Sequence, residues 1–339
     1  MTTPRPRASS LRVAAAANLG MALALAGCSA PQPPEVIAAD GVLCDITQRL
    51  AADDLRVSCL LQPGEDPHQF RLTPQQSREL SQAPLVLING YGLTPALASH
   101  SGALAVAERA VPDSPQLTGP PPDPHPQHDG HHAEEPSEAH NHGDRDPHVW
   151  HDPSQASAMV QLVARQLEQL KPAAKDRITA RAQQMTALLG QLDRWNRQQL
   201  ASIPTAKPLA SGHRAFASLA KAYGLEELPL VDGMSSSDSL RPQAFQAVLA
   251  NLQEKKVPML FAEQQPASKA LQRISSLSGV PLAPAPLVAD GLAKSSAGSG
   301  SSTLVATLTA NTCLIVNGLG GRCNQASGKS LAQRWQAIR

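Results

Sequence analysis

The chain has 339 residues. A single hydrophobic core rarely supports a chain of this length, so two domains are expected. Hydrophobic residues make up 42 % of the chain, which is enough to build cores, but aromatic residues make up only 3 %. A net charge of +1 and few aromatic side chains argue against a nucleic-acid partner, which would favour a basic surface and rings for base stacking.

The first 27 residues have the pattern of an export signal, with a basic start, an apolar Ala-rich run and small residues before Cys28. The run is too short for a good membrane span. The tetrapeptide LAGC, which ends at Cys28, resembles a bacterial lipobox, after which the cysteine is lipidated and begins the mature chain. Residues 28–34 then form a tether. An ordinary secretion signal with an incidental cysteine is the alternative.

Short apolar runs alternate with helical patterns between residues 35 and 110. Strands are predicted at 35–39, 55–61, 84–89 and 103–108, and helices at 42–51 and 73–82. This alternation predicts a mostly parallel sheet covered by helices. Continuous apolar strands such as LVLI fit burial on both faces of that sheet.

Residues 119–147 have no apolar period and are rich in proline, histidine and acidic residues, so they are predicted to form a disordered loop. A loop this long inside a domain is more often functional than not. Six of its histidines are candidate weak, pH-dependent metal contacts: His125, His128, His131, His132, His140 and His142. The alternative is a solvated spacer in which these histidines are incidental.

Two helical patterns follow the loop, at 153–170 and 172–201. The second could extend about 45 Å at 1.5 Å per residue, long enough to join two lobes. The strand–helix alternation returns from residue 207. Strands are predicted at 208–212, 228–231, 257–263 and 285–288, and helices at 213–224, 241–256, 266–279 and 302–319. The predicted organisation is an N-terminal lobe at 35–171, a linking helix at 172–201 and a C-terminal lobe at 202–339.

Four cysteines remain besides Cys28, and an exported protein meets an oxidising compartment, so two disulfides are plausible. Pairing of neighbours in the sequence, Cys44 with Cys59 and Cys313 with Cys323, is the simplest of the three connectivities. Free buried thiols are the alternative. A cysteine-based zinc site is less expected, because no CxxC spacing occurs.

Four scattered residues are candidate metal ligands: His68, His148, His213 and Asp290. Each lies after a predicted strand or where a helix begins, and ligand sites of open α/β sheets gather beyond the carboxyl ends of strands. Three imidazoles and one carboxylate suit tetrahedral zinc, whereas a site richer in carboxylates would favour manganese.

Each candidate also has an interpretation that needs no metal. A histidine at a strand end is often only a hydrogen-bonded surface residue, and Asp290 beside a glycine could be a turn acid. His151 could be the ligand in place of His148, because both flank Trp150.

The chain resembles the metal-binding lipoproteins of bacterial zinc/manganese ABC importers, the zinc branch in particular. The resemblance spans roughly residues 35–318 and rests on LLQPGEDPHQFRLTPQQ, the His-rich insertion, DPHVWHDP, SGHRAFASLAKAYGL and ADGL, in this order behind a lipobox. It implies two (β/α) lobes with mostly parallel sheets, one long bridging helix and a metal in the cleft between the lobes. It also places His68, His148, His213 and Asp290 on the ligand positions. Manganese-type members carry glutamate at the position of His213, so the resemblance favours zinc.

The resemblance also bears on the predicted roles of Glu263, His151 and Asp290. Glu263 matches a family acid expected to hydrogen-bond a ligand imidazole. His151 stands where the family usually has an apolar residue, which makes it a candidate auxiliary ligand near the cleft mouth. The segment after Asp290 is unusually rich in glycine and serine, so another loop carboxylate, or water, could replace Asp290.

The resemblance implies a monomeric, lipid-anchored protein, facing the periplasm or cell exterior, that binds zinc tightly and delivers it to an ABC permease with its cytoplasmic ATPase. An enzyme is not expected. The sequence holds no Walker loop, and a zinc hydrolase lacks support because neither HExxH nor GxSxG occurs. A manganese or iron importer component and a non-transport zinc buffer or adhesin are the alternatives.

Overall fold

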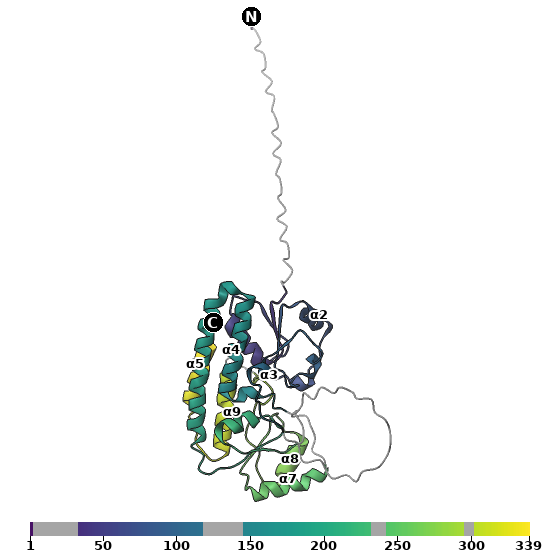
Figure 1. Cartoon of the computed structure of the whole chain (residues 1–339), viewed down its shortest axis with the longest axis vertical. Helices are drawn as coiled ribbons and strands as arrows, with labels where there is room; N and C mark the ends of the chain where they lie inside the picture. Colours follow the sequence, from purple (N-terminus) through teal and green to yellow (C-terminus); the bar gives the residue numbers. More distant parts are fainter. Residues whose placement is uncertain (3–32, 118–144, 232–241, 295–301) are drawn as a thin grey trace, which may run out of the picture. The chain divides into compact units, whose positions relative to one another are not determined.

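The computed structural model describes residues 1–2, 33–117, 145–231, 242–294 and 302–339. The export signal, Cys28 and most of the His-rich loop therefore lie outside the described residues. From residue 33 onward the described chain forms one body with two α/β lobes (Figure 1). Among the described helices, none combines the length and apolar character needed to cross a membrane.

A parallel sheet of four described strands forms the first lobe. These are β1 (Val36–Ala38), β2 (Val57–Cys59), β3 (Leu85–Ile88) and β4 (Leu104–Ala105), in the order β2-β1-β3-β4. Helices α1 (Gly41–Ala51), α2 (Pro74–Gln82) and α3 (Val106–Ala110) connect or follow them. The Asp40 side chain accepts hydrogen bonds from the first turn of α1, and Thr73 and Gln76 form a capping box at α2.

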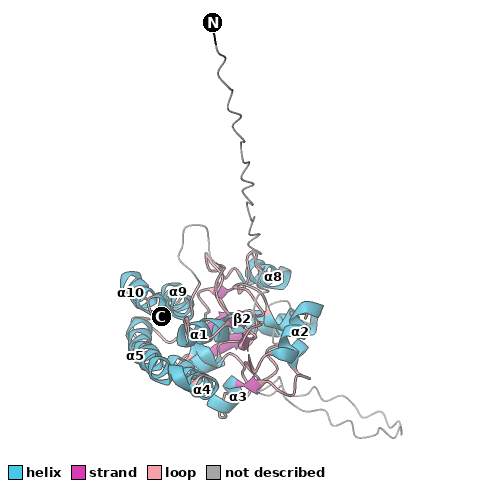
Figure 2. Cartoon of the chain, turned by 90° about the horizontal axis from the view of Figure 1, so that it is seen from above, coloured by secondary structure: helices cyan, strands magenta, loops and turns pink. Residues whose placement is uncertain are grey.

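Both faces of this sheet are buried, as its continuous apolar strands predict. Val36 and Ala38 pack into a core with residues of α1, α4 (Pro153–Leu170) and α5 (Lys175–Leu200), whereas Ile37 packs on the other face with Leu80 of α2. In the view from above, α5 and α2 lie on opposite sides of the strands (Figure 2). The strand predicted at 103–108 is wrong beyond Ala105, because the chain turns there into α3. An Ala-rich apolar run is ambiguous between strand and helix by periodicity alone.

The second lobe contains a smaller parallel sheet in the described residues. Its strands are β5 (Leu209–Ser211), β6 (Glu227–Pro229) and β7 (Leu260–Phe261), in the order β6-β5-β7. Its helices are α6 (Ala217–Tyr223), α7 (Pro242–Glu254) and α8 (Lys269–Ser278). The helix predicted from residue 213 begins only at Ala217, which leaves residues 212–216 as the turn that carries His213.

The strand predicted at 285–288 is absent from the described structure. Leu282 instead makes an isolated parallel bridge to Leu260, and Leu287 donates a backbone hydrogen bond to Ala262. Pro284 and Pro286 have no N–H to donate, so they interrupt a regular ladder at this edge. The segment leading to Asp290 is consequently an irregular loop beside β7.

Long helices run along both lobes. They are α4 (Pro153–Leu170), α5 (Lys175–Leu200) and α9 (Leu304–Gly318). The predicted linking helix is α5, which begins after a 3₁₀ turn at Pro172–Ala174. Near its start, Arg181 forms an ion pair of 2.8 Å with Asp54 of the first lobe. At its other end, Leu200 packs with Leu209 of the second lobe.

Helix α9 makes a second crossing between the lobes, and α10 (Gln325–Gln336) packs beside it; the sequence patterns did not predict α10. Asp45 of α1 accepts hydrogen bonds at 2.9 Å from the backbone N–H of Leu304 and at 2.7 Å from the indole of Trp335. Ile315, near the other end of α9, packs into the core of the second lobe. The chain therefore returns to the first lobe before it ends.

The two predicted disulfides are confirmed. Cys44 of α1 is bonded to Cys59 of β2, and Cys313 of α9 is bonded to Cys323 in the turn before α10. Each bond joins adjacent elements and leaves no thiol among these four residues.

Candidate metal site

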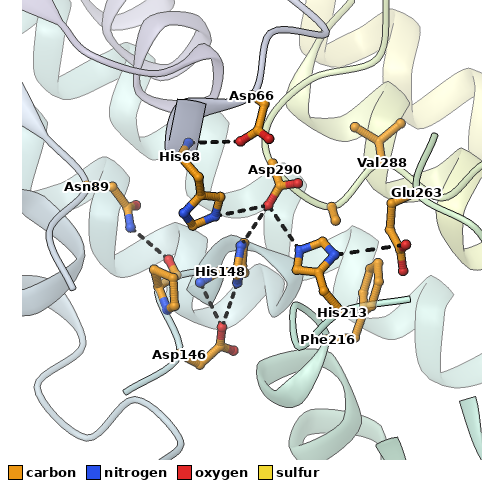
Figure 3. A network of polar contacts seen from close by, with 12 residues as sticks. Asp66, His68, Asn89, Asp146, His148, His213, Phe216, Glu263, Val288 and Asp290 are labelled. Carbon is orange, nitrogen blue, oxygen red and sulfur yellow. Dashed lines mark hydrogen bonds and ion pairs between the residues drawn. The ribbon is translucent and has the colours of Figure 1, made fainter. Parts of the chain in front are cut away.

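Three histidines predicted as metal ligands converge on one carboxylate oxygen of the fourth predicted ligand, Asp290 Oδ1 (Figure 3). The Nε2 atom of His148 lies 3.0 Å from this oxygen, that of His213 lies 3.2 Å away, and that of His68 lies 3.4 Å away. His68, His148 and Asp290 each offer a ligand atom within 4.8 Å of the other two. Residues separated by more than 200 positions in the sequence thus share one small volume between the lobes.

The first-lobe histidines are placed by two D-P-H tripeptides with the same local geometry. In each, the aspartate side chain accepts a hydrogen bond from the backbone N–H of the histidine two residues later, at 2.8 Å for Asp66 and His68 and at 2.9 Å for Asp146 and His148. Asn89, just after β3, donates at 2.7 Å to the carbonyl between Asp146 and His148. These bonds aim both imidazoles at the cleft.

The second-lobe histidine is placed by a glycine and a glutamate. Gly212 donates its backbone N–H to Glu263 at 2.6 Å, and a Cβ at Gly212 would lie 2.1 Å from the other carboxylate oxygen of Glu263. That second oxygen lies 3.9 Å from Nδ1 of His213, too far for a hydrogen bond but close enough for charge attraction. Only glycine at position 212 allows this approach.

The charges of the cluster are mutually dependent. Burial alone would raise the pKa of Asp290, but hydrogen bonds from His148 and His213 hold it well below its ordinary value. Burial opposes the charged form of His213, yet Asp290 and Glu263 raise its pKa to about 10. Burial would also lower the pKa of His148, but the contacts with Asp146 and Asp290 outweigh it and raise that pKa overall. Without metal, these contacts favour the positively charged form of both His148 and His213.

His213 joins the group of His68, His148 and Asp290 through its contact with Asp290, and the four residues together form a donor set that suits tetrahedral zinc. His148 and His213 are completely buried, whereas the side chains of His68 and Asp290 are each 10 % exposed. A cavity of about 1190 Å³ borders the site, and its walls include Asp66, Glu263 and Asp290. An ion would reach the cluster from this side.

His151 is completely buried rather than at the cleft mouth. Its Nε2–H donates at 3.0 Å to the carbonyl of Ala289, the residue before Asp290, and its ring packs against Phe216 in a tilted arrangement with 4.8 Å between the ring centroids. Burial and the nearby charge of His148 lower its pKa to about 4, so it stays neutral. In this arrangement His151 supports the loop that carries Asp290.

Replacing His151 by leucine should weaken metal binding by roughly ten- to a hundredfold, because the Asp290 loop would lose its hydrogen bond from the first lobe. His151→Gln is the matched control, since its amide can still donate to Ala289 and should retain most of the affinity. Titration of both variants with zinc checks this expectation. Equal affinities for the leucine and glutamine variants would contradict the supporting role of this hydrogen bond.

Asp146 and Asn89 are not among the site residues predicted from the sequence. The D-P-H repeat was the available signal for Asp146, because an aspartate two residues before another residue often bonds to its backbone. The six loop histidines, from His125 to His142, lie outside the described residues. The loop base is described, and there Gln116 forms an antiparallel bridge with Arg145, directly before the segment that holds His148.

Comparison with known proteins places the chain among metal importers. Residues 36–318 match the family model of zinc-uptake complex component A, periplasmic (ZnuA). The manganese ABC transporter substrate-binding lipoprotein PsaA of Streptococcus pneumoniae is 25 % identical over 261 residues, which cover 77 % of this chain and 81 % of that protein. The zinc-binding protein TroA of Treponema pallidum (strain Nichols) is 28 % identical over 237 residues, which cover 68 % and 70 %.

Solved structures share the same fold. The structure of the periplasmic zinc binding protein TroA from Treponema pallidum matches with a TM-score of 0.71 and 26 % identity, covering 85 % of this chain and 99 % of that one. A crystal structure of ZnuA matches with a TM-score of 0.64 and 20 % identity. The predicted α/β architecture with parallel sheets and a long helix is thereby confirmed.

Proposed function

Because the chain belongs to the family of periplasmic components A of zinc-uptake complexes, we propose that it captures Zn²⁺ outside the cytoplasmic membrane and delivers it to an ABC permease. The family supplies the metal-binding components of ABC importers, so membership implies a permease with its ATPase as partner. Zinc as the cargo, a monomeric state and a lipid anchor at Cys28 are parts of the proposal. The cargo is held by His68, His148, His213 and Asp290.

The convergence of three histidines on Asp290 Oδ1 is the observation that carries this proposal. Imidazole nitrogens are borderline-soft donors that suit zinc, whereas manganese prefers a larger share of oxygen ligands. Manganese is the second candidate, because PsaA, a relative of this chain, is named for manganese.

The His213→Glu variant separates the two cargoes. It replaces one nitrogen donor by oxygen, so the ratio of zinc affinity to manganese affinity should fall by roughly tenfold or more relative to the wild type. Competition titrations of both proteins measure this ratio, and native mass spectrometry of unsupplemented protein gives the metal bound on purification. A wild-type protein that carries manganese, or an unchanged ratio in the variant, would contradict the zinc assignment.

We further propose that the loop histidines give additional weak zinc contacts close to the site. The bridge between Gln116 and Arg145 sets the limits of a clean deletion, since removal of residues 120–143 leaves this bridge intact. Zinc titration of the full chain should show one tight equivalent and extra weak ones, and the deletion variant should keep the tight equivalent and lose the weak ones. Loss of the tight equivalent would mean that the loop belongs to the main site.

Anchoring at Cys28 has a direct test. Lipidation there should keep the mature chain in the membrane fraction, and Cys28→Ala should prevent processing at this residue and the attachment of lipid. Intact-mass measurement of the mature protein distinguishes a lipidated Cys28 from cleavage at another position, which would support the ordinary secretion signal instead.

A further inference from the structure

One buried carboxylate connects a candidate ligand to the opposite lobe. Oδ1 of Asp146 accepts a hydrogen bond from the backbone N–H of His148 at 2.9 Å and lies 3.0 Å from Nδ1 of the same residue (Figure 3). Oδ2 accepts from the backbone N–H and the hydroxyl of Ser218, at 3.0 and 2.8 Å. Asp146 is completely buried, and Ser218 lies in the first turn of α6. Oδ1 therefore contacts His148, and Oδ2 contacts Ser218 of the second lobe.

The contact at Oδ1 decides which nitrogen of His148 can bind an ion. An ionised carboxylate only accepts hydrogen bonds, so Nδ1 of His148 must carry the proton that faces Asp146. When an ion displaces the proton that Nε2 shares with Asp290, the lone pair is left on Nε2, the atom that lies 3.0 Å from Asp290 in the metal-free protein. A carboxylate behind a ligand imidazole also strengthens it as a donor.

We infer that Asp146 is a positioning residue of the metal site, which holds His148 with Nε2 toward the ion and ties that orientation to α6 of the second lobe. His213 lies in the turn immediately before α6. Asp146 therefore fixes the position of His148, in the first lobe, relative to His213, in the second lobe. This inference rests on the proposed metal-binding function, because it assigns His148 as a ligand.

Replacing Asp146 by asparagine keeps the shape of the side chain but gives it one acceptor where two are needed. If the amide NH₂ faces Ser218, it meets the N–H of that residue. If it faces His148, it meets the backbone N–H and turns Nδ1 into an acceptor, which moves the ring proton to Nε2 and blocks coordination. In either orientation the amide NH₂ faces another hydrogen-bond donor.

The test compares Asp146→Asn with Ser218→Ala in the full chain, using zinc alone as the probe. Asp146→Asn should lower zinc affinity by about ten- to a hundredfold. Ser218→Ala removes one hydrogen bond to Oδ2 and leaves the contacts with His148, so its loss should not exceed about threefold. Equal losses in the two variants, at matched melting temperatures, would overturn the inference. Absence of a tight site in the wild type would instead overturn the proposed function.

A histidine ¹⁵N NMR spectrum of the zinc-loaded wild type gives a second readout that a merely structural residue would not control. His148 should show a protonated Nδ1 and a zinc-bound Nε2, and Asp146→Asn should shift or abolish the Nδ1–H signal. Coordination of zinc through Nδ1 of His148 would overturn the inference even if the asparagine variant failed to fold.

Discussion

The Asp290→Asn variant should bind zinc roughly a hundred- to a few thousand-fold more weakly than the wild type. Removing one partner of a buried charge cluster costs about 3–5 kcal/mol, and each 1.4 kcal/mol is a tenfold change in affinity. Asp290 is the acceptor shared by His68, His148 and His213, and no other described residue is shown in contact with all three imidazoles. Isothermal titration or competition with a chelator measures the loss.

Glu65→Gln is the matched control for Asp290→Asn. Glu65 lines the same cavity and its removal also takes one negative charge from the region, but its carboxylate bonds to the backbone of Gln62. Zinc affinity of this variant should stay near that of the wild type. If Asp290→Asn binds zinc as tightly as Glu65→Gln, then another carboxylate or a water molecule completes the site, the alternative left open by the Gly/Ser-rich sequence after Asp290.

Zinc binding at neutral pH should release at least one proton from the protein. The pKa of His213 is raised to about 10, so its ring is positively charged in the metal-free protein at pH 7, and the raised pKa of His148 favours the charged form of that ring as well. Zinc needs their lone pairs and must displace those protons. The affinity should therefore increase as pH rises toward 10 and fall by about tenfold or more for each unit of decreasing pH.

Calorimetry in buffers with different ionisation enthalpies counts the protons released. The His213→Ala variant should release about one proton fewer, which assigns that part of the effect. The proton on His213 also stabilises the metal-free fold fully below the unfolded-state pKa of 6.5, and this contribution is lost as pH rises toward 10. Proton release near zero at pH 7 would contradict the charged cluster.

Local patterns predicted much of the fold. The alternation of strands and helices and the neighbouring cysteine pairs are both encoded within short stretches, and the structure confirms them. The errors occur where the local signal is ambiguous or is interrupted by proline. The Ala-rich run at 103–108 turns into a helix, and the proline-rich run at 285–288 does not complete a strand.

Contacts between distant parts of the chain could not be predicted in this way. The indole of Trp335 in α10 donates a hydrogen bond to Asp45, 290 positions away in the sequence, and the sequence near either residue does not indicate this contact. For the candidate site, spacing indicated only that four residues lie in similar loops, and the family resemblance selected them as ligands. Asp146 was missed because its second partner, Ser218, is 72 residues away on the other lobe.

Anomalous diffraction at the zinc absorption edge, from crystals of the zinc-loaded protein, tests the central claim most directly. The account predicts one strong peak between the lobes, bonded to Nε2 of His68, His148 and His213 and to a carboxylate oxygen of Asp290, at about 2.0–2.2 Å. A peak at another place, or three histidines too far apart to share one ion, would contradict it.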